Sequence, residues 1–133
     1  GAWLPLICTL NCTTVPEDVR TELAGAGCGL DHDAITKLAA AEAPGCGGLN
    51  YLPYLRGERT PNWPGASGAL IGMRHGMLGR PGLIYRAAVE GVTYSLLSGV
   101  GQMKRFGVSD LKELRVVGGG SKNPLWCDVI AGS

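Results

Sequence analysis

The sequence has almost no excess of acidic over basic residues or of basic over acidic ones. Its 133 residues carry 12 Lys and Arg against 11 Asp and Glu, which leaves a formal net charge of +1. Binding to nucleic acid or to an anionic membrane depends on clustered basic side chains, so we expect neither as a partner. With 45% apolar and 17% charged residues, the composition is that of a folded domain.

Long apolar runs are missing too. Residues 2–10 are apolar, but a transmembrane helix needs about 20 such residues, and this stretch lacks the charged leader of a signal peptide. We expect an intracellular protein, either cytoplasmic or, if a transit peptide has been lost upstream, located in the chloroplast.

Paired cysteine motifs are absent as well. The five cysteines are irregularly spaced: Cys8, Cys12, Cys28, Cys46 and Cys127. No CxxC pair occurs, and neither His32 nor His75 lies at zinc-finger spacing from a cysteine. Reduced thiols in an intracellular protein are the favoured interpretation. Cys8 and Cys12 could face each other on a helical turn, which leaves a metal or redox protein as an alternative that lacks ligand spacing.

Glycine, by contrast, is abundant, with 22 residues that gather at segment junctions, where turns require it. The patterns predict helices over 17–24, 31–43, 81–106 and 123–131, with Asp31 as an N-cap and Pro81 as a first helical residue. They predict strands over Leu49–Leu55, Gly68–Met73 and Leu114–Val117.

Small residues recur at every fourth position of the longest predicted helix: Ala87, Gly91, Ser95 and Gly99. Each glycine costs about 1 kcal/mol relative to alanine in a helix interior. We expect a closely packed neighbour to compensate for that cost.

The sharpest feature is a strand, a glycine turn and a helix in succession, over residues 116–126. Three glycines allow positive φ angles and let a ligand lie against bare backbone, and free N–H groups at the helix start favour a phosphate or a polar nucleotide edge. It is not a Walker A loop, because Ser121 precedes Lys122. The nucleotide-binding candidates are Gly118, Gly119, Gly120, Ser121 and Asn123. A plain tight turn remains the alternative.

A second polar segment, residues 51–64, combines aromatic residues, prolines and the charged residues Arg56, Glu58 and Arg59. It could bind polar ligand groups or a neighbouring domain. Alternatively, Glu58 pairs with an arginine and locks the loop.

Three other kinds of polar residue have simpler interpretations. His75 is expected at the surface, Glu90 on a helix face or satisfied by packing, and Asp31 and Asp33 at a helix start. We assign no catalytic residue and no metal ligand.

Four runs together resemble the C-terminal domain of FGGY carbohydrate kinases. They are YLPYLRGERTPNWP at 51–64, GALIGM at 68–73, RAAVEGVTYSLL at 86–97 and VVGGGSKNPLWCDVIA at 116–131. Their order and spacing are those of the family. The segments GAWLPL and LNYLPYLRGERTPNWP most resemble plant and cyanobacterial members that are similar to xylulose or D-ribulose kinases.

The resemblance implies an α/β fold, an actin-like, ribonuclease H-like ATPase domain that is incomplete here. Residues 1–133 would be part of a C-terminal nucleotide-binding domain that binds ATP with Mg²⁺, while sugar binds mainly to an N-terminal domain. By position, Gly118, Gly119 and Asn123 would contact the adenosine part of ATP, with Ser121 and Lys122 nearby. The family's catalytic Asp lies upstream of anything present in this sequence.

We therefore expect the chain to be part of an ATP-dependent carbohydrate kinase that acts on a ketopentose, D-ribulose or D-xylulose. These residues alone are expected to be inactive. The alternative is a truncated, non-catalytic remnant (a pseudokinase) that binds nucleotide weakly or serves as an interaction surface. The last block ends Ile130-Ala131-Gly132-Ser133 where members usually read Ile-Ala-Asp. Because a domain without an edge strand exposes backbone and apolar surface, we also expect self-association.

Overall fold

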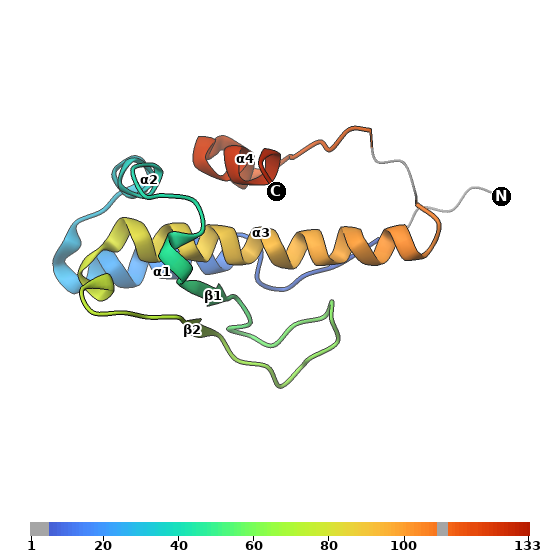
Figure 1. The fold of residues 1–133 in the computed structure, drawn as a ribbon, viewed down its shortest axis with the longest axis horizontal. Helices are drawn as coiled ribbons and strands as arrows, with labels where there is room; N and C mark the ends of the chain where they lie inside the picture. The colour runs from blue at the N-terminus through green and yellow to red at the C-terminus, as the bar shows by residue number, and fades with distance from the viewer. Residues whose placement is uncertain (1–5, 109–111) are drawn as a thin grey trace.

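A computed structural model describes residues 6–108 and 112–133. The elements follow one another as α1 (Thr14–Leu23), α2 (His32–Ala40), β1 (Asn50–Leu52), β2 (Ala69–Ile71), α3 (Pro81–Arg105) and α4 (Pro124–Ala131). Short helical turns lie at Ala24–Cys28, Cys46–Gly48, Met77–Gly79 and Gly119–Lys122. In Figure 1, α3 runs the length of the molecule, with α2 and α4 on one side and the β1–β2 hairpin on the other.

Helix α3 begins and ends where the sequence predicts. Pro81 occupies its first turn, where a missing N–H costs nothing. The helix ends at Arg105, and Gly107 follows with a φ of 93° that favours glycine. Every residue from Gly82 to Thr93 is buried, so the first half of the helix is enclosed on all sides. Within the described residues, no helix is long and apolar enough to cross a membrane.

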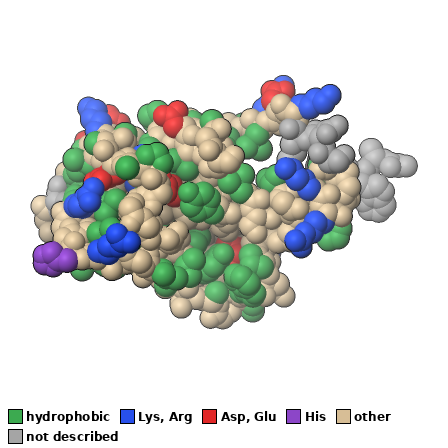
Figure 2. All heavy atoms as spheres, viewed as in Figure 1, with side chains coloured by type: hydrophobic (Ala, Val, Ile, Leu, Met, Phe, Trp, Pro, Cys, Tyr) green, Lys and Arg blue, Asp and Glu red, His purple; other side chains and the backbone are tan. Residues whose placement is uncertain are grey.

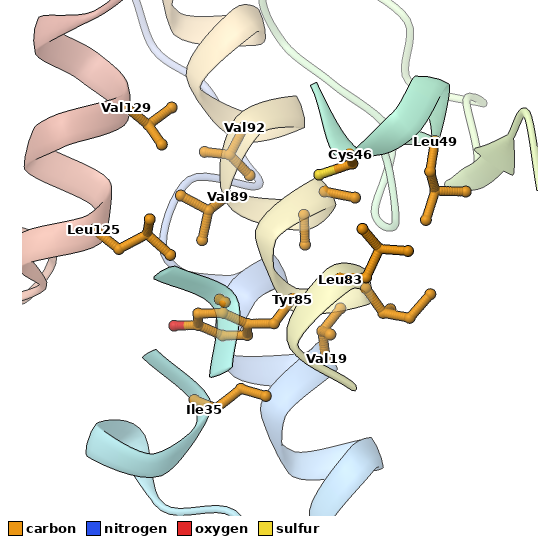
Figure 3. Packing of buried hydrophobic residues seen from close by; sticks show 14 of the residues in the cluster. Val19, Ile35, Cys46, Leu49, Leu83, Tyr85, Val89, Val92, Leu125 and Val129 are labelled. Carbon is orange, nitrogen blue, oxygen red and sulfur yellow. The ribbon is translucent and has the colours of Figure 1, made fainter. Parts of the chain in front are cut away.

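The hydrophobic core forms around the enclosed half of α3. Figure 3 shows Val89 and Val92 of α3 facing Leu125 and Val129 of α4, while Ile35 of α2 and Val19 of α1 lie further along. The fully buried side chains of this core include Val15, Ile35, Ala39, Cys46, Ala88 and Val89. The helices are thus positioned by one shared apolar cluster, which supplies most of the driving force for their packing.

The predicted small-residue positions are where α3 meets its neighbours. A Cβ atom at Gly91 would overlap the backbone carbonyl oxygen of Tyr51 in β1. A Cβ at Gly99 would lie 3.0 Å from the side chain of Ile7. The expectation of a close approach is confirmed at both positions.

A buried ion pair within α3 is hydrogen-bonded to α2 and to the segment that follows it. Arg86 Nε lies 2.8 Å from Glu90 Oε1, and both side chains are more than nine-tenths buried. The amide of Gly45 donates to both oxygens of Glu90, at 3.2 and 3.1 Å, and Arg86 Nη1 donates to the carbonyl of Ala39 at 3.3 Å. Glu90 is therefore satisfied by packing, as predicted. Burial, and next the charge of Glu90, raise the pKa of Cys46 to about 12, so that thiol stays protonated.

The sheet is smaller than the sequence predicts. Strands β1 and β2 pair antiparallel, with Tyr51 opposite Leu70, inside the two longer predicted segments. The third predicted strand, Leu114–Val117, is wrong: the segment is irregular and exposed, with Val117 86% accessible. Its β-branched residues suit a strand, but a strand also needs a hydrogen-bonded neighbour. Among the described residues, none lies beside it.

Large apolar side chains remain exposed in several places, and two regions hold most of them. Figure 2 shows hydrophobic atoms gathered over the face that carries the hairpin and its loop. Its exposed members include Leu52, Leu55, Trp63, Ile71 and Met73, and the second region contains Phe106, Leu114, Val116 and Val117. Such surfaces favour association; the self-association of this chain stays a prediction.

Two glycines of the same helix make a matched test of the close approach. We expect Gly91→Ala to lower the free energy of unfolding by about 2 kcal/mol or more, because the new methyl overlaps backbone that cannot rotate away. Gly101→Ala meets no atom within 4 Å, so it should raise stability by about 0.5–1 kcal/mol. Urea denaturation of both variants checks this, and equal effects would contradict the packing of α3 on β1.

Candidate nucleotide-binding site

The glycine turn leads directly into α4. Gly118 has a φ of 94°, and Gly119–Lys122 then form one 3₁₀ turn. The amide and the hydroxyl of Ser121 both donate to the carbonyl of Gly118, at 3.2 and 2.7 Å. The amide of Asn123 donates to the carbonyl of Gly120 at 3.1 Å. The predicted candidates therefore lie together in one locally closed turn.

The three glycines of the turn differ in what requires a glycine at each position. Gly118 requires its positive φ. A Cβ at Gly120 would lie 2.8 Å from the ring of Trp126, so packing excludes a side chain. At Gly119 the φ is ordinary and no heavy atom lies within 4 Å of a Cβ. Since neither conformation nor packing within the described residues requires Gly119, its bare backbone is open to an approaching ligand.

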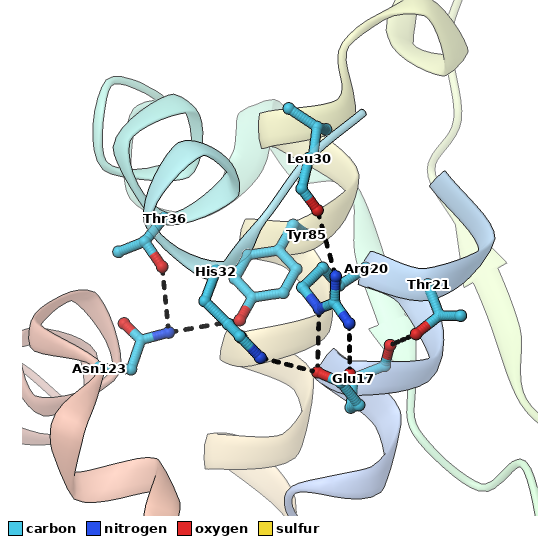
Figure 4. A network of polar contacts seen from close by, with 8 residues as sticks. All are labelled: Glu17, Arg20, Thr21, Leu30, His32, Thr36, Tyr85 and Asn123. Carbon is cyan, nitrogen blue, oxygen red and sulfur yellow. Dashed lines mark hydrogen bonds and ion pairs between the residues drawn. The ribbon is translucent and has the colours of Figure 1, made fainter. Parts of the chain in front are cut away.

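Asn123 has a structural role that the sequence interpretation missed. Its Oδ1 accepts a hydrogen bond from the amide of Trp126 at 3.2 Å, which makes it the N-cap of α4. Its Nδ2 donates to the hydroxyls of Thr36, at 3.4 Å, and Tyr85, at 3.3 Å (Figure 4). The signal was present, because Asn followed by Pro is the usual pairing of N-cap and first helical residue. The predicted contact of Asn123 with nucleotide stays a prediction.

The start of α4 can attract an anion. The start of a helix carries a partial positive charge, worth about 0.3–1 kcal/mol to a nearby anion at an exposed site. In α4, Pro124 has no N–H and the amide of Trp126 donates to Asn123, so this charge comes from the helix dipole more than from free donors. The exposed residue Lys122 directly precedes Asn123. The turn thus combines open backbone with positive charge, which suits a phosphate or the polar edge of a nucleotide.

The polar segment at 51–64 is locked by Glu58, but not through an arginine. The Glu58 carboxylate is 1% exposed and accepts from the amides of Leu10 and Arg59, at 2.8 and 2.7 Å. Asn11 Nδ2 donates to it at 3.2 Å and to the carbonyl of Gly57 at 2.6 Å. The predicted arginine side chain was the wrong partner, because Leu10 and Asn11 come from the start of the chain, which the local pattern does not reveal.

The arginines of that segment point to other groups. Arg59 donates to Cys8 Sγ at 3.6 Å, and Arg56 lies 4.0 Å from Asp18. Both arginines are exposed. No hydrogen bond between described residues joins this loop to the glycine turn, so the structure does not bring the two polar segments into one site.

The remaining predictions concern single polar residues. His75 is exposed, as expected. Asp31 caps α2 by accepting from the amide of Ala34 at 2.7 Å, and Asp33 lies in the first turn of that helix. Among the residues described, no three His, Cys, Asp or Glu side chains gather to hold a metal ion.

Comparison with known proteins decides the family. Residues 12–132 match the FGGY family of carbohydrate kinases, C-terminal domain. The chain belongs to this family. Its fold is the actin-like ATPase fold of these C-terminal domains, present in part.

The relatives of this FGGY domain include bacterial xylulose kinases. The chain is 40% identical over 126 residues to xylulose kinase from Streptomyces rubiginosus, covering 95% of the chain and 23% of that protein. It is 30% identical over 131 residues to xylulose kinase from Haemophilus influenzae, covering 98% and 25%. The likeness to plant and cyanobacterial members stays a prediction.

Solved structures share the fold. Xylulose kinase from Bifidobacterium adolescentis matches with a TM-score of 0.75 at 32% identity, covering 90% of this chain and 22% of that one. Xylulose kinase from Rhodospirillum rubrum matches with a TM-score of 0.82 at 25% identity, covering 93% and 24%. The chain thus spans about a quarter of the length of the curated relatives it matches.

Glu58 gives the locked loop a dependence on pH. Burial works to raise its pKa, but hydrogen bonds from the Arg59 and Leu10 amides and from Asn11 outweigh burial and lower it below 4.5. The ionised carboxylate therefore stabilises the fold above about pH 4.5, and that stability is lost as the pH falls through the lower, folded pKa.

We expect Glu58→Gln to lower the free energy of unfolding at pH 7 by about 1–3 kcal/mol, because the hydrogen bonds lose their charged acceptor and the new NH₂ group faces the donor of Asn11. The difference from the unmodified chain should shrink below about pH 4.5. Glu113→Gln, at an exposed ion pair, should change stability by less than about 0.5 kcal/mol. A pH-independent difference for Glu58→Gln, measured by denaturation at several pH values, would refute this role for the carboxylate.

Proposed function

We propose that this chain forms the nucleotide-binding part of an ATP-dependent carbohydrate kinase. In this proposal the whole enzyme transfers the γ-phosphoryl group of ATP to a hydroxyl of a ketopentose. D-Xylulose is favoured over D-ribulose, since the relatives include several proteins named xylulose kinase. The family assignment supports the reaction class.

Gly119 is the observation that carries the nucleotide site. It lies between Gly118, which needs its positive φ, and Gly120, where the ring of Trp126 leaves no room for a side chain. The surroundings of Gly119 itself are open. Under this proposal, the nucleotide lies against the backbone at Gly119, while the start of α4 and Lys122 supply the positive charge for a polar or anionic edge.

Mg²⁺ accompanies ATP in reactions of this class and neutralises the phosphate charge. The described residues do not by themselves fit a metal site, because no three potential ligands gather among them. We therefore derive no step through the metal, and residues outside this chain would complete its coordination. The same holds for the catalytic carboxylate, which the family resemblance assigns upstream. The 133 residues alone would bind and orient nucleotide without catalysing transfer.

A non-catalytic remnant is the competing function. The exposed, irregular segment at 112–117 offers apolar surface for such a role. A remnant of this kind would associate through exposed apolar surface and leave nucleotide affinity low.

Binding of ADP to the chain, measured by calorimetry, tests the site. We expect Gly119→Ala to keep the stability of the unmodified chain, because its methyl meets nothing within 4 Å. Its affinity for ADP should fall about tenfold, as the methyl occupies the surface on which the ligand lies. Gly120→Ala is the contrasting change and should lower stability by about 1–3 kcal/mol through its clash with Trp126.

Unchanged ADP binding by Gly119→Ala would place the ligand elsewhere on the domain. Asn123→Ala is a poorer test, because it also removes the N-cap of α4, a loss of about 1 kcal/mol. A folded chain that binds no ADP would contradict a self-sufficient site and favour the remnant.

A chimera tests whether the domain supports phosphoryl transfer. Residues 12–132 would replace the matching quarter of xylulose kinase from Streptomyces rubiginosus, and turnover of ATP with D-xylulose would be followed in a coupled assay. We expect activity in the chimera, a raised KM for ATP in its Gly119→Ala variant, and none in the isolated chain. A folded but inactive chimera would favour the remnant.

A further inference from the structure

The side chain of Asn123 is held by two hydroxyls from other helices. Thr36 belongs to α2 and Tyr85 to α3, and they lie 87 and 38 positions away from Asn123 in the sequence. Figure 4 shows the amide of Asn123 directed toward both oxygens. The residue that begins α4 is therefore tied to two elements that form the core.

The chemistry of the amide gives this arrangement one orientation. Oδ1 can only accept, and it takes the amide hydrogen of Trp126. Nδ2 can only donate, and its two hydrogens are directed at Thr36 and Tyr85. A flipped amide could still accept from the two hydroxyls, but it would face the N–H of Trp126 with a donor. The helix N–H therefore selects the orientation of Asn123, and the two hydroxyls then act as acceptors.

Tyr85 is suited to act as an acceptor at this point. Its residue is 4% exposed, so its oxygen has little access to water. Burial raises the pKa of Tyr85, whereas the hydrogen bond from Asn123 acts to lower it. The phenol remains protonated at neutral pH, and its lone pairs are available to the amide.

The glycine turn is tethered mainly from this side. Residues 112–117 precede it without a backbone hydrogen bond to another described residue, and they are exposed. On the other side, Trp126 Nε1 donates to Thr93 at 3.0 Å and fixes α4 one turn further on. Within the turn and α4, Cys127 Sγ donates to the carbonyl of Ser121 at 3.5 Å. Asn123 is the residue near Gly119 that bonds to α2 and α3, so its position sets how the turn is held against the core.

We propose that Tyr85 and Thr36 are positioning residues for the glycine turn, acting through Asn123. Neither needs to touch the ligand. They fix the rotamer that caps α4, and the cap fixes the position of the Gly119 backbone relative to the start of α4. The consequence for nucleotide affinity rests on the function proposed above, whereas the ordering of the turn does not.

Hydrogen exchange of single backbone amides, measured by NMR on the whole chain, tests the ordering directly. Tyr85→Phe and Thr36→Val each remove one acceptor with little change of shape. We expect the amides of Ser121, Asn123 and Trp126 to exchange about two- to tenfold faster in each variant, the range for loss of one hydrogen bond. The affinity for ADP, measured on the same samples, should weaken by a similar factor.

Matched variants separate positioning from general loss of stability. Thr36→Ser keeps the hydroxyl and should restore both exchange and affinity. Tyr94→Phe makes the same chemical change on α3 at a side chain that is 50% exposed, and it should leave both unchanged. A purely structural role of Tyr85 would lower the melting temperature without singling out the amides of the turn.

The outcomes decide between the claims. Unchanged exchange in both Tyr85→Phe and Thr36→Val overturns the proposal. Faster exchange with unchanged ADP affinity overturns the positioning role, because the turn would then be ordered without being used. If the unmodified chain binds no ADP, the proposed site fails in this chain, while the exchange rates still decide whether Tyr85 and Thr36 order the turn.

Discussion

Enclosure of the first half of α3 is the constraint on which this structure depends. Twelve consecutive positions, Gly82 to Thr93, are buried, so the helix must satisfy neighbours on every side. A polar face toward water is excluded, and the one ion pair in this half, Arg86 with Glu90, must be matched by backbone partners. Removing one member of such a pair leaves an uncompensated buried charge, a loss of about 3–5 kcal/mol. The hairpin, α1, α2 and α4 all pack against this half of α3, so its buried side chains determine where each of them lies.

The features that the sequence predicted correctly are those decided by local chemistry. Pro81 suits the first turn of a helix because it has no N–H to satisfy, Asp31 caps the residues that follow it, and small residues four apart share one helix face. The errors came from partners far along the chain. Glu58 is satisfied by Leu10, Asn11 and the backbone amide of Arg59, and not by the side chain of an arginine. The segment at 114–117 has no strand beside it among the described residues. No local pattern of residues carries that information.

The candidate site shows the same division in one short segment. Its order of elements and its glycine-rich character could be predicted, and the family resemblance followed from the same residues. What could not be predicted is how each residue is used. Asn123 was expected to contact a ligand, yet the structure gives its amide three partners within the protein. Those partners come from α2, α3 and α4, and only the folded chain brings them together.

The structure excludes any side chain at Gly91 but leaves room for one at Gly119, and this difference has a consequence for natural variation. Every replacement at Gly91 brings a Cβ atom into the backbone of β1, so the requirement to fold is enough to remove variants there, whatever the protein does. At Gly119 the described structure itself tolerates a methyl group. A population in which folding alone were under selection would therefore accumulate changes at Gly119 while keeping Gly91.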